Sequence, residues 1–89
     1  MGKYVVHRVD ANAEAIWQAM EQLGASIYRG GPLDGIVGFR GETWLVEVKT
    51  AKGKLRASQK AFLARWKGNA LVLRTVEEGV KLLGVIGRY

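Results

Sequence analysis

The chain has 89 residues, a net charge of +6 and no cysteine. This length fits one domain with a small core, so we expect residues 1–89 to form a single domain. Without cysteine, neither disulfide bonds nor thiolate zinc sites are available. The apolar runs are too short to span a bilayer and the N-terminus has no signal-peptide pattern. We therefore expect a soluble, cytoplasmic protein without a membrane partner.

The N-terminal part of the chain predicts a helix between two short strands. Residues 4–6 are apolar enough for a strand, or for an arm that packs on a neighbour. Asp10 or Asn12 can cap a helix that runs to about Leu23 and ends at Gly24. We expect this helix to pack on a sheet through an apolar stripe of Ile16, Trp17, Met20 and Leu23. The run of residues that follows Gly24, up to Arg29, has a short strand pattern.

A β-hairpin is expected over residues 34–49. Two apolar runs rich in β-branched and aromatic residues flank Arg40 and Gly41, which is typical of two strands joined by a tight turn. Side chains alternate between the two faces of a strand, so the second run divides into two sets. We expect the core face to carry Trp44, Val46 and Val48, and the opposite face to carry Leu45, Glu47 and Lys49.

The hairpin would bring three charged groups together. Glu47 and Lys49 are two residues apart, so they project from one face with roughly 6.6 Å between their Cα atoms. Asp34 opens the first strand and can return beside the end of the second. Because two crowded carboxylates repel each other, the arrangement makes physical sense if a hard cation such as Mg²⁺ lies between them. A salt-bridged pair on an exposed strand would give the same Glu-Val-Lys triplet.

A basic loop and a helix are expected after the hairpin. Residues 50–57 form the loop, and Ser58 can cap a helix over residues 59–67 that is closed by Gly68 and Asn69. The buried stripe of this helix is expected to consist of Phe62, Leu63 and Trp66.

The C-terminal residues predict one strand and one helix. Residues 70–74 should form a fully buried strand, parallel to the second strand of the hairpin. Residues 75–78 match a capping box that opens a helix through about Leu83, and residues 85–89 form an apolar tail. The order α-β-β-β-α-β-α indicates an α/β domain with a small mixed β-sheet flanked by helices.

Positive charge is concentrated in one segment of the chain. No acidic residue occurs between Lys49 and Thr75, whereas eight basic residues do. They are Lys49, Lys52, Lys54, Arg56, Lys60, Arg65, Lys67 and Arg74. A segment of one sign beside a carboxylate–lysine cluster suggests contact with a phosphate backbone, although a solvated helix face would have the same composition.

These residues resemble a known nuclease family. Asp34 followed by Glu47-Val48-Lys49 looks like the PD-(D/E)xK nuclease signature. The continuation through Thr50 into the basic loop, with Gln59 at the start of a helix, resembles the small stand-alone members of the virus-type replication-repair nuclease (VRR-Nuc) group of phages and bacteria. The resemblance covers about residues 12–83. One departure is that Leu33 separates Pro32 from the Asp, where the family usually has the proline directly before it.

The resemblance implies a restriction-endonuclease-like core and a metal-dependent reaction on DNA. Mg²⁺ or Mn²⁺ would be held by Asp34, Glu47 and the carbonyl of Val48. An acid on the first helix often completes the site in this family, and Glu14 is the better match, although an ordinary solvated glutamate would look the same. Lys49 would orient the attacking water or stabilise the transition state. Gln59 would reach back toward the active site and the phosphate.

The basic segment and the resemblance together indicate the partners. The DNA-binding residues would be Lys52, Lys54, Arg56, Lys60, Arg65 and Lys67. We expect a homodimer that acts on branched DNA such as four-way (Holliday) junctions, in a bacterial cell or a phage-infected host. Few base-reading features are visible, which favours selection of DNA structure over sequence. A non-catalytic nucleic-acid-binding module, or a nuclease subunit completed by a partner protein, are the alternatives.

Overall fold

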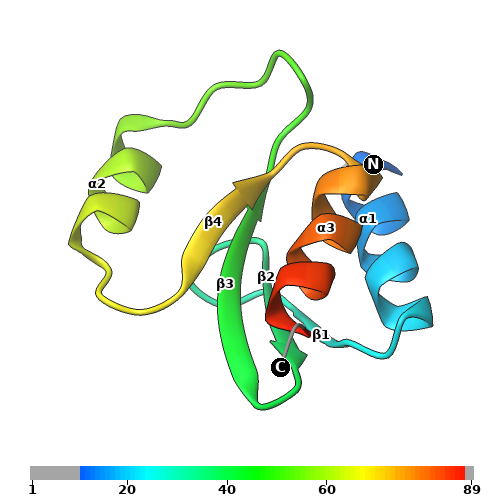
Figure 1. Ribbon diagram of the computed structural model, residues 1–89. Helices are drawn as coiled ribbons and strands as arrows, with labels where there is room; N and C mark the ends of the chain where they lie inside the picture. The colour runs from blue at the N-terminus through cyan, green and yellow to red at the C-terminus, as the bar shows by residue number, and fades with distance from the viewer. Residues whose placement is uncertain (1–10, 88–89) are drawn as a thin grey trace, which may run out of the picture.

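A computed structural model describes residues 11–87 of the chain (Figure 1). The elements are α1 (Ala11–Gln22), β1 (Ser26–Arg29), β2 (Gly35–Phe39), β3 (Glu42–Val48), α2 (Ala57–Arg65), β4 (Ala70–Leu73) and α3 (Val76–Ile86). This is the predicted order α-β-β-β-α-β-α. The strand or arm expected at residues 4–6, the alternative cap Asp10 and the end of the expected tail lie outside the described residues.

The four strands form one mixed sheet in the order β1-β2-β3-β4. β2 pairs antiparallel with both β1 and β3, whereas β4 pairs parallel with β3, with Glu47 opposite Val72. A parallel pair needs a crossover connection, which α2 and its flanking loops provide. At the hairpin turn, Arg40 has φ 50° and Gly41 has φ 82°. Two successive positive φ angles match the type I′ turn that joins twisted strands, so the predicted hairpin is confirmed.

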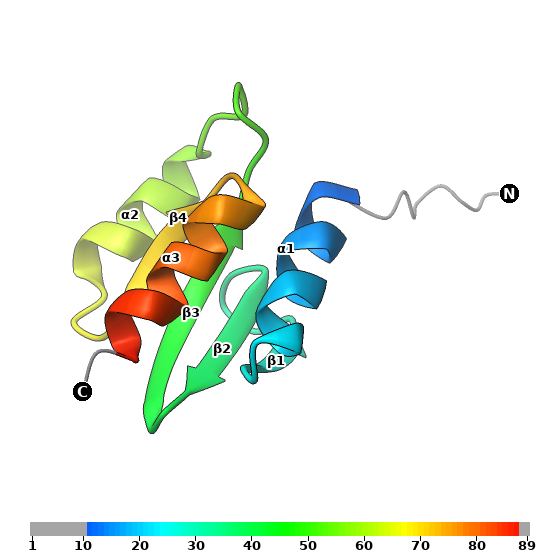
Figure 2. The same cartoon turned by 45° about the vertical axis from the view of Figure 1, so that its right-hand side comes forward.

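The helices lie on both sides of the sheet. In Figures 1 and 2, α1 and α3 lie together over one face of the sheet, and α2 stands on the opposite side. The core fills the space between the sheet and the α1–α3 layer, and its fully buried side chains are Ile16, Met20, Val37 and Val46. Val46 and Val48 are buried in this core, Trp44 packs against it, and Leu45 is buried outside it. The predicted faces of β3 are therefore confirmed.

Close packing at Gly35 fixes the start of β2 against α1. A Cβ atom at Gly35 would lie 2.8 Å from the ring of Trp17, so no larger residue fits without displacing that buried ring. Trp17 therefore packs directly on the backbone next to Asp34. The stripe of α1 is buried as predicted except at its end, because Leu23 lies past the last helical residue and is 52% exposed.

Helix α2 differs from the prediction. It starts at Ala57 with Arg56 as N-cap, so Ser58 lies inside the helix and is not its cap. The reason is that the Gln59 side chain accepts a hydrogen bond from the Arg56 backbone N–H, which starts the helix earlier. The prediction of a buried stripe on this helix is also wrong. α2 buries none of its residues, because the helix stands away from the core (Figure 1).

Two further corrections concern the C-terminal elements. Strand β4 is half buried over most of its length, because it is an edge strand of the sheet and not a fully buried one. Helix α3 continues to Ile86, which is buried in the core, so residues 85 and 86 belong to a helix and not to a tail. Thr75 caps α3 as predicted, since its Oγ1 accepts a hydrogen bond from the Glu78 backbone N–H at 3.1 Å. The predicted capping box is only half formed, because Glu78 Oε1 accepts from the Arg74 backbone N–H at 2.6 Å and not from that of Thr75. Within residues 11–87, no helix has the length and apolar character to cross a membrane.

Candidate active site

The end of the β2–β3 ladder brings Asp34 to Val48. The ladder closes at the pair Gly35–Val46, so the Val48 backbone N–H has no partner in β2. The carboxylate of Asp34 takes that place, and its Oδ2 accepts the hydrogen bond at 2.9 Å. The N–H and C=O of one residue in a strand point to the same side. The carbonyl of Val48 therefore lies on the strand edge that faces Asp34.

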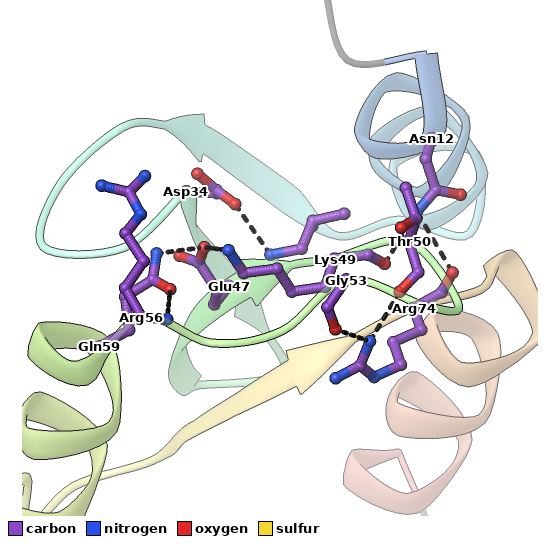
Figure 3. A network of polar contacts seen from close by, with 10 residues as sticks. Asn12, Asp34, Glu47, Lys49, Thr50, Gly53, Arg56, Gln59 and Arg74 are labelled. Carbon is purple, nitrogen blue, oxygen red and sulfur yellow. Dashed lines mark hydrogen bonds and ion pairs between the residues drawn. The ribbon is translucent and has the colours of Figure 1, made fainter.

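Glu47 is the buried carboxylate of the site, with only 4% of its surface exposed. Its Oε2 accepts a hydrogen bond from Gln59 Nε2 at 2.7 Å and lies 3.5 Å from Lys49 Nζ (Figure 3). Burial raises the pKa of Glu47, and the negative charge of Asp34 raises it further, while the Lys49 ammonium lowers it. The acidic pair, Asp34 and Glu47, is thus close enough for mutual repulsion, as the sequence predicted.

Gln59 connects this buried acid to α2. Its Oε1 accepts from the Arg56 backbone N–H at 2.8 Å while its Nε2 donates to Glu47. One side chain therefore holds both the first turn of the helix and the orientation of the carboxylate. The structure brings together Asp34, Glu47, Val48, Lys49 and Gln59, which are five of the expected site residues.

Two residues that sequence reasoning did not assign to the site hold the loop after β3. Arg74 Nη1 donates to the backbone carbonyls of Thr50 at 2.6 Å and Gly53 at 2.7 Å. Asn12 Nδ2 donates to the carbonyls of Lys49 at 3.1 Å and Arg74 at 3.2 Å, which ties α1 to the ends of β3 and β4. The sequence offered only weak signals for these roles, since Asn12 was one of two possible helix caps and Arg74 was counted with the basic residues. Asn12 is not a cap, because α1 begins at Ala11.

Glu14 lies in a different polar group. Its two carboxylate oxygens accept from Arg29, at 3.0 Å from Nε and 3.1 Å from Nη2. Among residues 11–87, no group of three or more Asp, Glu, His or Cys side chains is placed to hold a metal ion. The structure therefore does not bring Glu14 together with Asp34 and Glu47, and its role as a ligand stays a prediction.

The six expected DNA-binding residues are all exposed: Lys52, Lys54, Arg56, Lys60, Arg65 and Lys67. In Figure 3, the Arg56 side chain extends beside Glu47 on the side where Asp34 lies. Across residues 11–87, none of the six is in an ion pair. Their charge is available to an anionic partner on the loop and helix that border the acidic pair.

Comparison with solved structures identifies the architecture around this site. A chain described as "VRR_NUC domain" superposes with a TM-score of 0.69, over 89% of this chain and 95% of that chain, at 23% sequence identity. The chain has the fold of a VRR_NUC domain. The fold class expected from the sequence is thereby confirmed. A scan against protein-family models and a search of curated proteins found no match.

Within this VRR_NUC fold, the donor atoms of the site suit a hard divalent cation. Two carboxylates and one strand carbonyl supply oxygen ligands, which Mg²⁺ and Mn²⁺ prefer. In the described part of the chain, Lys49 is the cation paired with Glu47 of the acidic pair. A bound cation would compensate the remaining charge of a carboxylate that burial has removed from water. The residues present therefore fit the expected metal.

Proposed function

We propose that this chain is a divalent-metal-dependent endonuclease that hydrolyses phosphodiester bonds in DNA. The observation that carries the proposal is the acidic pair with Lys49 at the end of the β2–β3 ladder. A buried acid next to a second acid is costly for the free protein, and such groups are concentrated at functional sites. The similarity to a VRR_NUC domain supports the same activity.

Each residue of the site has a distinct role in the proposed reaction. Asp34, Glu47 and the Val48 carbonyl would hold Mg²⁺ or Mn²⁺, and the bound metal would acidify a water and neutralise charge on the phosphate. Lys49 would orient that water or stabilise the charge of the transition state. Gln59 keeps Glu47 in one orientation through its hydrogen bond at 2.7 Å. The exposed basic residues would bind the DNA backbone.

Cleavage assays with site variants test the proposal. Asp34→Asn and Glu47→Gln should abolish cleavage of DNA in Mg²⁺ or Mn²⁺, while DNA binding persists because the basic residues are unchanged. Ca²⁺ should occupy the site yet support little cutting, because its looser coordination positions the water poorly. Full wild-type activity in excess EDTA would contradict the metal site.

The proposed substrate is branched DNA bound by a twofold dimer. Few base-reading features are visible in the sequence, which favours selection of DNA structure over sequence. A twofold dimer presents two equivalent active sites, as symmetric cleavage of a four-way junction requires. Leu23 and Val80 are exposed and line one hollow of about 310 Å³ with Phe39, Arg40 and Leu83. We propose that the apolar side chains of this hollow contact the second copy.

Light scattering and substrate comparison test these two points. We expect the mass of a dimer at micromolar concentration, and faster cleavage of a four-way junction than of a linear duplex of the same sequence. A monomer that cuts both substrates at equal rates would exclude this form of the proposal and leave the nuclease activity itself intact.

A further inference from the structure

Helix α2 and its C-cap residue carry an aromatic pair that does not belong to the core. The rings of Phe62 and Trp66 are stacked, with centroids 5.3 Å apart and an angle of 20° between their planes. Trp66 is 44% exposed, and Phe62 is half buried. A tryptophan of a small domain usually contributes a large buried area, so this exposure indicates that the pair has another use.

The aromatic pair lies on the side of α2 that faces the acidic pair. Gln59 and Phe62 occupy positions i and i+3 on one side of α2. Trp66, at i+7, is the C-cap on the same side, and its backbone N–H donates to the Phe62 carbonyl as in the helix. Gln59 is the residue whose side chain contacts Glu47. At 1.5 Å per residue, seven residues place the Trp66 backbone about 10.5 Å along the axis from Gln59. The pair therefore continues from the candidate active site over a distance of a few nucleotides.

The charge around the aromatic pair selects its partner. Lys60, Arg65 and Lys67 are exposed on the same helix or directly after it, and no acidic residue occurs from position 48 to 76. Two copies that met through α2 would bring these like charges together, which is unfavourable. A polyanion with flat aromatic groups has the complementary chemistry, and nucleic acid is such a polymer.

We propose that the stacked rings of Phe62 and Trp66 bind an unpaired nucleobase of the DNA strand that enters the candidate active site. This inference rests on the proposed function and specifies its substrate. In a continuous duplex both faces of each base are covered by neighbouring bases, so a free face exists only where a base is unpaired or extruded. Base stacking on aromatic side chains is tolerant of sequence, because every base has a π-face.

A binding assay in EDTA tests the inference without the need for cleavage. Fluorescence anisotropy compares a labelled blunt duplex with the same duplex carrying a single-stranded overhang. We expect wild type to prefer the overhang and Trp66→Leu to lose about tenfold of its affinity for the overhang DNA alone. Trp66→Phe should retain most of the preference, because it keeps an aromatic ring. Trp44→Phe is the matched control, since Trp44 lies half buried on β3 and donates to Glu42 at 2.9 Å.

Intrinsic fluorescence gives a second measurement of the same contact. Trp17 is buried, so in the Trp44→Phe variant the solvent-sensitive emission comes from Trp66. Addition of the overhang DNA should quench this emission more strongly than addition of the blunt duplex.

Three outcomes would decide against the inference or against the nuclease proposal. Equal affinity of wild type and Trp66→Leu for the overhang DNA would overturn the stacking site. A dimeric wild type with a monomeric Trp66→Leu variant would overturn it as well, because Trp66 would then contact a second copy. Absence of metal-dependent cleavage by wild type, with the overhang preference present, would instead overturn the proposed enzymatic activity and keep the binding site.

Discussion

Without metal, the Glu47→Gln variant should be at least as stable as wild type. With metal bound, wild type should be the more stable of the two. Burial and the charge of Asp34 raise the pKa of Glu47 in the folded protein. In metal-free protein, the stability contributed by a neutral Glu47 is therefore present at low pH and is lost as the pH rises through the folded-state pKa. At pH 8 in EDTA, Glu47→Gln removes an unfavourable buried charge, and its amide oxygen can still accept the hydrogen bond from Gln59.

Metal binding should stabilise the wild-type protein by a measurable amount. A ligand at 100 times its Kd that binds only the folded state adds about 2.7 kcal/mol. For a domain of 60–100 residues, 1 kcal/mol shifts Tm by about 4–8 °C. With 89 residues, this chain should therefore gain roughly 10–20 °C in saturating Mn²⁺. Glu47→Gln should gain little, because one of the two carboxylate ligands is absent.

Thermal unfolding followed by circular dichroism measures both effects. We expect Glu47→Gln to melt at or above the wild-type Tm in EDTA and below it in Mn²⁺. Asp34→Asn serves as a second ligand variant and should also lose the gain in Mn²⁺. If wild type melts at the same temperature in EDTA and in millimolar Mn²⁺ or Mg²⁺, the acidic pair does not bind these ions and the reasoning fails.

Three further predictions concern residues around the acidic pair. Replacement of Lys52, Lys54 and Lys60 by glutamine should weaken binding to all DNA alike. The slope of log affinity against log salt concentration should flatten by about 0.9 per lost phosphate contact. Unchanged affinity over several salt concentrations would mean that this basic segment is only a solvated surface. Arg74→Met removes the hydrogen bonds to the Thr50 and Gly53 carbonyls, so amide hydrogen exchange should rise in residues 50–56 and cleavage should slow, whereas unaltered exchange would show that the loop holds itself. Glu14→Gln breaks an exposed pair with Arg29, so the loss in unfolding free energy should stay at or below about 1 kcal/mol and cleavage should continue, while an inactive variant would identify Glu14 as a ligand.

The geometry of the acidic pair could be predicted from local pattern, because register in a hairpin follows from its turn. Arg40 and Gly41 mark a two-residue turn, and counting outward from it brings Asp34 opposite the end of β3. The contact between Gln59 and Glu47 could not be predicted from local pattern in this way. It joins residues on different elements, and the resemblance to the VRR-Nuc family suggested its direction before the structure gave its hydrogen bond.

Other features could not be predicted, because periodicity identifies an apolar side of an element without showing what covers it. The stripe of α2 has helical spacing like that of α1, yet α1 packs into the core and α2 buries no residue. The apolar run of β4 likewise fits a central strand or an edge strand. The ion pair of Glu14 with Arg29 and the bonds of Asn12 depend on tertiary neighbours that spacing along the chain does not reveal.

The same structural feature that ends the β2–β3 ladder also holds the candidate active site. Beyond Gly35 the backbone of β2 no longer pairs with β3, and the N–H of Val48 would lack a partner without the carboxylate of Asp34. One oxygen of Asp34 is therefore used for folding, and the other is the one that the proposed metal site would use. Glu47 is divided in the same way, since Gln59 and Lys49 both contact Oε2. In the proposed metal site, each member of the acidic pair would offer one oxygen to the metal, while its second oxygen holds the carboxylate in place before the metal binds.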